Sequence, residues 1–274
     1  MTKKADLQGT SKAPDSLSAA AIRNALSTEV LGRKLFYWPQ VGSTNDEASR
    51  LAREGAPDGT LVISDFQESG RGRLGRRWIA EPATSLLFSL VFRPPLAPHQ
   101  VQRLTMVCGL GVADAVESET DLRVGLKWPN DIVVDGAKLG GLLTEIGLEG
   151  QRVDYAVVGI GLNVNLDPKQ LPEGLLTPVT SLSHLLGREV ARVPLLCTLL
   201  QAIEARYLAL KTGYSPHSEW MKRLVNLGQT VVASMPGSTL EGVAEGVDAE
   251  GALLVRLADG SLETIVAGDV TLRT

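Results

Sequence analysis

The segment Ser85–Phe92, with the sequence SLLFSLVF, constrains the fold of this chain more than any other. It is a continuous apolar run of strand length, and Arg93-Pro94-Pro95 closes it. An apolar run of this length without strict alternation is typical of a strand that is covered on both faces. Tyr155–Ile160 is a second run of the same kind. The sequence therefore predicts buried strands at both positions.

The region before Ser85 predicts helices and further strands. A short helix is expected around Ser18–Leu26, and a strand at Lys34–Trp38. A second helix starts within Ser43–Glu47 and ends near Gly55, a residue that suits the left-handed position after a helix. Thr60–Asp65 alternates and is rich in β-branched residues, as strands are.

The region after Phe92 predicts a long core helix followed by a hairpin. Pro98–Glu119 has helical periodicity with small residues. Asp135-Gly136 is a tight-turn signal between two short strands. The remaining expected elements are strands at Arg123–Lys127, Asp131–Val134 and Leu142–Ile146, and helices at Pro194–Leu210 and Pro216–Leu224.

The character of the sequence changes from Asn226 onward. Short alternating segments separated by glycines and an Asp-Gly turn predict a compact all-β module of about fifty residues, such as a small barrel. We therefore expect three parts, namely a disordered tail at 1–16, a main domain at 17–225 and the β module at 226–274.

Composition excludes several classes of protein. A net charge of −4 argues against a broad surface for nucleic acid. The first residues lack the apolar stretch of a signal peptide, and no run approaches the ~20 apolar residues that span a bilayer, so we expect a cytoplasmic protein. Cys108 and Cys197 lie in apolar segments without metal-site or redox spacing, which indicates buried, reduced thiols.

Positive charge is concentrated in the segment GRGRLGRRW at residues 70–78. Its three glycines give the backbone freedom, while its four arginines supply planar, multi-donor groups suited to phosphate or carboxylate. This combination predicts a mobile loop that orders over an anion.

Other glycine-rich anion loops fit this segment poorly. A dinucleotide-binding fingerprint needs a helix directly after its glycines, whereas Arg-Arg-Trp and a β-rich run follow Gly75. A protein kinase would carry His-Arg-Asp and Asp-Phe-Gly downstream, and neither occurs. A flexible nucleic-acid segment would be a small footprint on an acidic chain. The remaining interpretation is a lid over an anionic small molecule.

Further clusters of polar and charged residues favour a binding site. They are KWPND at 127–131, KLGG at 138–141 and GIGLNVN at 159–165. They combine lysines, a carboxylate and amides with glycines that let a ligand approach the backbone closely.

Each of these residues also has a plainer interpretation. Asp131 is explained equally by a turn, Lys138 by a solvated hairpin and Asn163 by a loop. Thr44 and Glu47 have the spacing of a capping box, which by itself would explain the Ser-Thr-Asn sequence there. These plainer explanations account for each residue singly, but they account less well for all the clusters together.

Taken together, the segments strongly resemble the biotin–protein ligases. The matching elements are GSTN at 42–45, QESGRGRLGRRW at 67–78, KWPNDI at 127–132, KLGG at 138–141 and GIGLNVN at 159–165. The similarity spans roughly residues 36–274. It implies an α+β catalytic domain with a mixed sheet flanked by helices, related to class II synthetases, and an SH3-like barrel at the C-terminus.

The resemblance also implies the reaction. Biotin and ATP, assisted by Mg²⁺, give biotinyl-5′-AMP and pyrophosphate, and the activated biotin passes to a lysine of a biotin carboxyl carrier protein, such as that of acetyl-CoA carboxylase. Because the carboxylate of biotin is already ionised at pH 7, activation needs cations rather than a base. The reactive adenylate needs protection from water, which a closing loop supplies.

Site residues follow from the resemblance in three groups. Those expected in catalysis are Lys138, Arg73, Asp131 and Lys127, with Asp131 a candidate to orient or deprotonate the acceptor lysine. Those expected at biotin are Ser43, Thr44, Asn45, Gln67, Arg71, Gly72, Arg73 and Lys138. Those expected at ATP are Arg71, Arg73, Arg76, Trp78, Lys127, Asn130, Asp131 and Asn163. The expectation includes no metal ligands from the protein.

The alternatives are a lipoate–protein ligase and a non-catalytic biotin-sensing regulator. The arginine loop and KWPND favour biotin over lipoate. About 35 polar, tail-like residues precede the expected core, so binding to operator DNA is not expected, and neither is a membrane partner. The sequence leaves open whether the protein is a monomer or a homodimer, which carriers it modifies, and what Arg76 and Arg77 do.

Overall fold

The strand predicted at Ser85–Phe92 is β3 of a seven-stranded sheet in the computed structural model of the chain, and its bounds agree with the prediction. All of its residues are buried. It pairs antiparallel with β2 (Leu61–Ser64) on one side and with β7 (Arg152–Asn163) on the other. The structure describes residues 17–172, 174–175, 177–235, 238–266 and 268–272. The tail predicted at 1–16 lies outside the described residues.

The sheet is mixed, with the strand order β1-β2-β3-β7-β6-β5-β4. β1 (Leu35–Trp38) runs parallel to β2, whereas the other described neighbours are antiparallel. β7 pairs with β6 (Ala137–Glu149) along almost its whole length, so the two form one long hairpin. β5 (Asp131–Val134) and β4 (Gly125–Lys127) complete the sheet. This architecture confirms the expected mixed sheet.

The predicted tight turn between β5 and β6 is present. Asp135 and Gly136 have φ angles of 47° and 77°, the left-handed pair that a two-residue hairpin turn needs. The turn returns the chain so that Lys138 lies beside Val133 and Gly141 beside Asp131. The KWPND and KLGG segments are thereby brought next to each other.

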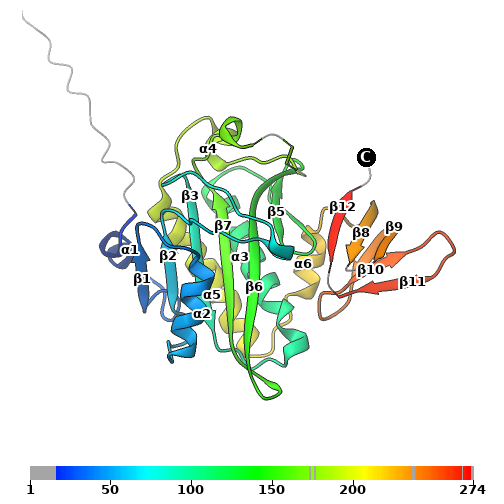
Figure 1. Ribbon diagram of the computed structural model, residues 1–274, viewed down its shortest axis with the longest axis horizontal. Helices are drawn as coiled ribbons and strands as arrows, with labels where there is room; N and C mark the ends of the chain where they lie inside the picture. Colours follow the sequence, from blue (N-terminus) through cyan, green and yellow to red (C-terminus); the bar gives the residue numbers. More distant parts are fainter. Residues whose placement is uncertain (1–16, 173, 176, 236–237, 267, 273–274) are drawn as a thin grey trace, which may run out of the picture.

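Helices cover both faces of the sheet (Figure 1). α2 (Thr44–Arg53) packs on one face, against β2, β3 and β7. α3 (Gln102–Glu119) and α5 (Arg192–Lys211) pack against each other on the opposite face. Because side chains of a strand alternate, Leu86, Phe88, Leu90 and Phe92 join the core on the α3 side, while Val91 joins the smaller cluster under α2. β3 is therefore buried on both faces, as predicted.

The shorter helices lie around the rim of the sheet. α1 (Ala19–Ala25) and α6 (His217–Arg223) agree with predicted helices. α4 (Leu182–Leu186) was not predicted, because one and a half turns carry too little periodicity to detect.

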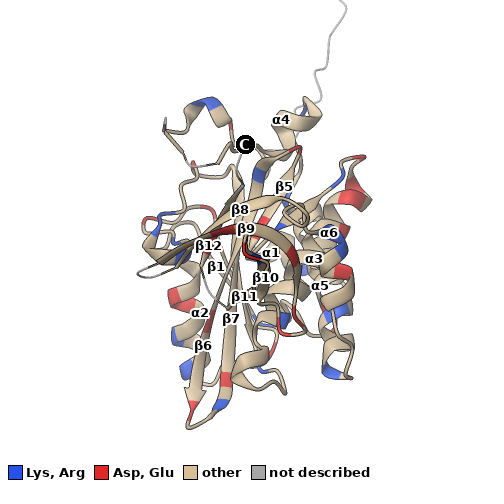
Figure 2. Ribbon diagram, turned by 90° about the vertical axis from the view of Figure 1, so that its right-hand side faces the viewer, with Lys and Arg blue, Asp and Glu red and all other residues tan. Residues whose placement is uncertain are grey.

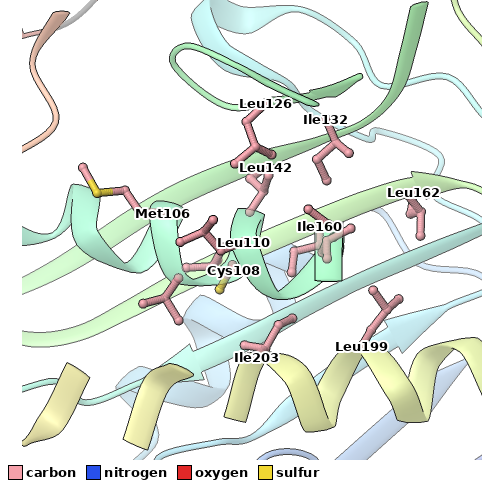
Figure 3. Packing of buried hydrophobic residues seen from close by; sticks show 14 of the residues in the cluster. Met106, Cys108, Leu110, Leu126, Ile132, Leu142, Ile160, Leu162, Leu199 and Ile203 are labelled. Atoms are coloured by element: carbon pink, nitrogen blue, oxygen red, sulfur yellow. The ribbon is translucent and has the colours of Figure 1, made fainter. Parts of the chain in front are cut away.

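The larger core lies between the sheet and the α3–α5 pair (Figure 3). It includes Cys108 and Leu110 of α3, Leu199 and Ile203 of α5, and Ile160 of β7. Cys108 and Cys197 are both free and buried, as expected. Burial raises the pKa of the Cys108 thiol, so it stays protonated and unreactive.

Helix α5 has the length and hydropathy of a membrane-spanning segment, with a mean hydropathy of 1.4 over its 18-residue window. The expectation that no run would approach this length was therefore wrong for α5. In the fold, half of that window is buried, and Leu196, Leu199 and Leu200 pack into the core. Its apolar residues thus have a partner within the protein.

The C-terminal residues form a separate antiparallel sheet with the order β11-β10-β9-β8-β12. Its strands are β8 (Thr230–Met235), β9 (Ser238–Val247), β10 (Leu253–Arg256), β11 (Leu262–Ile265) and β12 (Asp269–Leu272). This agrees with the predicted all-β module. Among the described residues the sheet stays open, since no pairing between its edge strands β11 and β12 closes a barrel.

The C-terminal sheet is fastened to the main domain by polar contacts. The indole of Trp128 donates to the carbonyl oxygen of Gly251 at 2.8 Å, and Arg103 forms an ion pair with Glu250 at 2.8 Å. His217 of α6 lies 2.8 Å from the carbonyl oxygen of Val247. Figure 2, viewed from this side of the molecule, shows β8–β12 in front of the main sheet. These contacts dock the C-terminal module against the main domain.

Candidate functional site

The residues assigned to the site from the sequence converge on one cleft of about 170 Å³. It is bounded by the start of α2, the loop 70–78, the turn before β5, strands β6 and β7, and β12 of the C-terminal sheet. Thirteen of the fourteen assigned residues line it, and Asn163 is the exception. Motifs that lie far apart along the chain therefore meet at one place in the fold.

One side of the cleft is a hydrogen-bonded floor built from Thr44, Gln67 and Ser89. Gln67 Oε1 accepts from the backbone N–H of Thr44 at 2.7 Å and from its hydroxyl at 3.0 Å. Ser89 Oγ lies 2.8 Å from Thr44 Oγ1. Because the amide oxygen of Gln67 is occupied twice, its NH₂ group is the part left to donate toward the cleft.

The capping box predicted at Thr44 and Glu47 is wrong. The N-cap of α2 is Ser43, which makes no side-chain capping bond, and Thr44 is the first helical residue. The hydroxyl of Thr44 contacts Gln67 and Ser89 instead, while Glu47 pairs with Arg50 on the helix surface. The Ser-Thr-Asn sequence therefore builds the cleft rather than the helix end.

Asn45 is held in one orientation by three partners on strands β3 and β6. Its Oδ1 lies 2.7 Å from Ser89 Oγ, and its Nδ2 donates to Leu143 O at 3.2 Å and to Glu145 Oε2 at 2.8 Å. The space for this amide depends on Gly159, because a Cβ there would lie 2.0 Å from Asn45 Oδ1. The first glycine of GIGLNVN thus makes room for a polar side chain.

The loop 70–78 folds back on itself as a small hairpin. Its backbone bonds join Gly72 N–H to Arg76 O at 2.7 Å and Trp78 N–H to Gly70 O at 2.9 Å. Leu74 and Gly75 at its tip have left-handed φ angles of 54° and 73°. After the single 3₁₀ turn at Arg73–Gly75 the next element is strand β3 and not an α-helix, which agrees with the rejection of a dinucleotide fold. That the loop moves remains a prediction.

The arginines of the loop have different partners. Arg71 lies 2.7 Å from Asp46 and 3.0 Å from Glu145. Arg73 donates to the carbonyl oxygen of Gly268 at 3.1 Å, while its Nε is buried without a hydrogen-bond partner in the described part of the chain. Burial, and then repulsion from Arg76, lower the pKa of Arg73.

Arg76 and Arg77, whose roles the sequence left open, contact different parts of the protein. Arg76 pairs with Asp269 on β12, and Arg77 donates to the carbonyl oxygen of Glu68 at 3.2 Å. Arg76 therefore links the loop to the C-terminal sheet, whereas Arg77 ties the loop to its own stem.

The lysines lie on the opposite side of the cleft, beside a single carboxylate. Lys138 Nζ is 2.6 Å from Asp131 Oδ1 and 5.6 Å from the ring centre of Trp78. Burial lowers the pKa of Lys127, an effect that Asp131 opposes. Asp131 is only 18% exposed, so a negative charge is held between two lysines where solvent is scarce.

Glycines on β6 and β7 let the Trp78 ring lie flat against the sheet. A Cβ on Gly161 would lie 2.6 Å from the indole, and one on Gly141 would lie 3.4 Å from it and 3.4 Å from Lys138 Nζ. The indole N–H of Trp78 is buried without a hydrogen-bond partner among the described residues. KLGG and GIGLNVN therefore supply a flat surface as well as polar groups.

The cleft is strongly cationic although the chain is acidic. Six cationic side chains and two carboxylates line it, on a chain whose net charge is −4. The cations are Arg71, Arg73, Arg76, Arg77, Lys127 and Lys138, and the carboxylates are Asp131 and Asp269. Such a site attracts an anion with several charges, such as a polyphosphate.

Metal-binding side chains are sparse in the part of the chain that the structure describes. It contains no group of three or more His, Cys, Asp or Glu that could hold an ion. A magnesium ion that entered this cleft would therefore take most of its ligands from phosphate oxygens and water, as Mg²⁺ commonly does.

The assigned amides lie in different surroundings. Asn130 lines the cleft and donates to the carbonyl oxygen of Leu142. Asn163 is buried, and its Nδ2 donates to Thr180 O at 3.0 Å. Its Oδ1 has no partner among the described residues. Contact between Asn163 and a nucleotide stays a prediction.

Several residues of the site were missed from the sequence. Ser89 was read as part of an apolar run, although a serine in such a run is itself a signal. Glu145 and Asp269 carry no local signal, because their partners are far away in the chain. Val270 and Thr271 join the cleft only because the C-terminal sheet docks against the loop.

Two family profiles match the chain. The biotin/lipoate A/B protein ligase family matches residues 37–163, and the biotin protein ligase C-terminal domain matches residues 227–273. Among curated proteins, the bifunctional ligase/repressor BirA of Bacillus subtilis is 35% identical over 263 residues, covering 95% of this chain and 81% of that protein. The biotin–[acetyl-CoA-carboxylase] ligase of Mycobacterium tuberculosis is 32% identical over 246 residues, covering 87% of this chain and 88% of that protein.

Solved structures are similar as well. The biotin protein ligase of Aquifex aeolicus in complex with biotin and ATP superimposes with a TM-score of 0.74 at 30% identity. The match covers 88% of this chain and 99% of that one. The similarity therefore extends through both the main sheet and the C-terminal module.

Proposed function

The chain belongs to the biotin/lipoate A/B protein ligase family, and we infer that it activates biotin with ATP and passes it to a carrier lysine in the cleft described above. The observation that carries this assignment to the cleft is its charge, six cations against two carboxylates on an acidic chain. A carboxylate and a triphosphate repel each other, and this excess of positive charge allows them to meet.

In the first half-reaction, an oxygen of the biotin carboxylate attacks the α-phosphorus of ATP. The bond to the β-phosphate oxygen breaks, and pyrophosphate leaves with the electron pair. Arg73, Arg76, Lys127 and Lys138 are the side chains that neutralise the reacting oxygens and the leaving group. Mg²⁺ bound to the phosphates would supply further charge neutralisation.

The floor at Thr44, Gln67 and Ser89 suits the biotin end of biotinyl-5′-AMP, and the flat surface at Trp78 suits its adenylate end. The NH₂ group of Gln67, left free by the two bonds to its oxygen, is a donor for the ureido oxygen of biotin. Ser43, Thr44 and Asn45 surround it with further polar atoms. On the opposite side of the cleft, Trp78 and Asn130 contact the adenylate, and so does Asn163 at the end of β7.

In the second half-reaction, the amine of the carrier lysine attacks the acyl carbon of biotinyl-5′-AMP. AMP leaves, and the lysine loses a proton to become an amide nitrogen. Because a lysine has a pKa near 10.4, a nearby carboxylate helps by orienting the amine or accepting its proton. Asp131 takes this role once Lys138 turns from it to the phosphate or acyl oxygens.

Transfer from preformed biotinyl-adenylate tests the role of Asp131 directly. We expect Asp131→Ala to slow transfer to a carrier domain by about 10²-fold, the contribution typical of a positioned acid or base. Asp131→Asn, which keeps a hydrogen-bond acceptor but no charge, separates orientation from proton transfer. Normal transfer by Asp131→Ala would show that the carboxylate has no part in this step.

The acceptor that fits this chemistry is a biotin carboxyl carrier domain, as in acetyl-CoA carboxylase, with the reaction taking place in the cytoplasm. Biotin is favoured over lipoate because the C-terminal module matches the biotin protein ligase domain, and because the similar Aquifex aeolicus structure is a complex with biotin and ATP. A labelled-substrate assay with carrier domains of both kinds distinguishes the two. Equal labelling by lipoate would contradict the assignment.

A further inference from the structure

The carboxylate of Glu145 on β6 joins two parts of the site that lie far apart in the sequence. Both of its oxygens accept from Arg71 Nη2 in the loop 70–78, at 3.0 and 3.2 Å, and one of them also accepts from Asn45 Nδ2 at 2.8 Å. Its side chain is 37% exposed and does not line the cleft. A single side chain thus contacts both the loop above the cleft and the amide in its floor.

The guanidinium of Arg71 is already neutralised by acids. Asp46 at the start of α2 lies 2.7 Å from the same Nη2 atom that contacts Glu145. A cation between two carboxylates has little charge left for a ligand, in contrast to Arg73, whose buried Nε has no hydrogen-bond partner among the residues described. The Arg71 side chain therefore ties the loop to α2 and β6.

Glu145 and the backbone carbonyl of Leu143 together fix which way the Asn45 amide points. Both groups only accept hydrogen bonds, so they select the NH₂ group of Asn45 and turn Oδ1 toward the hydroxyl of Ser89. Ser89 Oγ lies 2.8 Å from Thr44 Oγ1, and Thr44 contacts Gln67. Glu145 is thereby connected, through Asn45 and Ser89, to the residues around Gln67.

We propose that Glu145 is a positioning residue that couples closure of the loop 70–78, through Arg71, to the alignment of the Asn45–Ser89–Thr44–Gln67 floor. The proposal rests on the function proposed above, in which the floor receives biotin and the loop covers its adenylate. With the loop closed, the carboxylate holds both partners and the intermediate is retained. When Arg71 leaves, Glu145 loses its cation and the loop loses its link to the floor.

The chain offers a matched control for this coupling. Asp46→Asn removes a carboxylate from the same arginine but leaves Asn45 and its partners untouched. Glu145→Gln removes the charge and replaces one of the two accepting oxygens with an NH₂ group, which cannot accept from Arg71 or Asn45. Glu145→Asp keeps the charge on a side chain one methylene shorter.

The experiment uses the full chain with ATP, Mg²⁺ and biotin. One measurement is the KM for biotin in adenylate formation. The other is the rate at which preformed biotinyl-adenylate escapes from the cleft, which is measured as biotin labelling of a protein that is not a carrier. We expect Glu145→Gln to raise the KM for biotin about tenfold, as the loss of a charged hydrogen bond does, and escape about threefold. We expect Asp46→Asn to raise escape about threefold and to leave the KM for biotin within twofold of wild type.

The outcomes separate coupling from a purely structural role. Partial recovery of both quantities in Glu145→Asp would support the proposal, since a misfolded site would not recover with charge. A KM for biotin in Glu145→Gln equal to that of wild type, or a rate of adenylate escape in Glu145→Gln equal to that of wild type, would overturn it. A wild-type chain that forms no biotinyl-adenylate would instead refute the proposed function, before any variant is compared.

Discussion

Substituting Gly159 with alanine should cost the protein its affinity for biotin, because the methyl group would occupy the place of the Asn45 amide. The added Cβ would lie 2.0 Å from Asn45 Oδ1 and 2.8 Å from its Cγ, far inside van der Waals contact. Asn45 cannot shift within the floor, since Ser89, Leu143 and Glu145 hold it from different sides. The side chain must therefore turn out of the site.

The size of this effect follows from the bonds that are lost. Each neutral hydrogen bond contributes about 0.5–1.5 kcal/mol, and overpacking of a tight site costs about 1–3 kcal/mol. We expect a loss of about 2 kcal/mol in binding, which is about 30-fold in the dissociation constant for biotin. Gly246→Ala on β9 is the control, because its Cβ would lie 3.9 Å from Met221 Sδ of α6, an ordinary van der Waals distance.

Isothermal titration calorimetry with biotin measures the affinity, and thermal unfolding without ligand checks that each variant folds. Gly246→Ala should bind biotin like wild type. If Gly159→Ala bound biotin within threefold of wild type while remaining folded, Asn45 would not hold the substrate site in the way described.

Other parts of the account make smaller predictions. Trp128→Phe leaves the carbonyl oxygen of Gly251 without its buried donor and should lower the free energy of unfolding by about 1–3 kcal/mol in urea titrations, whereas an unchanged value would mean that the module docks without this bond. The hydrogen bonds from Arg223 lower the pKa of Glu117, so this carboxylate contributes stability above its ordinary pKa of about 4.3 that is lost as the pH falls through the lowered value. Glu117→Gln should therefore flatten the loss of stability between about pH 5 and 3, and an identical pH profile would exclude the pair as its cause. A gel-shift assay with biotin and ATP should detect no operator complex with this chain, and a specific shifted band would contradict that expectation.

The strands were predictable because each carries its own signal. β3 and β5 have the bounds predicted for them, since an apolar run and an Asp-Gly turn mark their ends locally. Thirteen of the fourteen residues that the resemblance to biotin–protein ligases assigned to the site line the cleft. Local signals were enough for the strand bounds, whereas the site residues depended on the resemblance.

The interactions between distant segments were not predictable in the same way. Thr44 looked like part of a helix cap, but Gln67, 23 residues away, is its partner. Glu145 lies 100 residues from Asn45, and Asp269 reaches Arg76 from the other end of the chain. These pairs depend on how the β6–β7 hairpin and the C-terminal sheet pack, which no local sequence pattern indicates.

Biotin-dependent exchange of pyrophosphate into ATP tests the central claim most directly, because it reports formation of biotinyl-adenylate in the cleft. Wild type should show exchange with biotin and little with lipoate. Lys138→Ala should lose about 10²-fold or more, since it removes a cation at the reacting oxygens and leaves Asp131 there without its partner. Exchange that does not require biotin, or that survives unchanged in Lys138→Ala, would contradict the account.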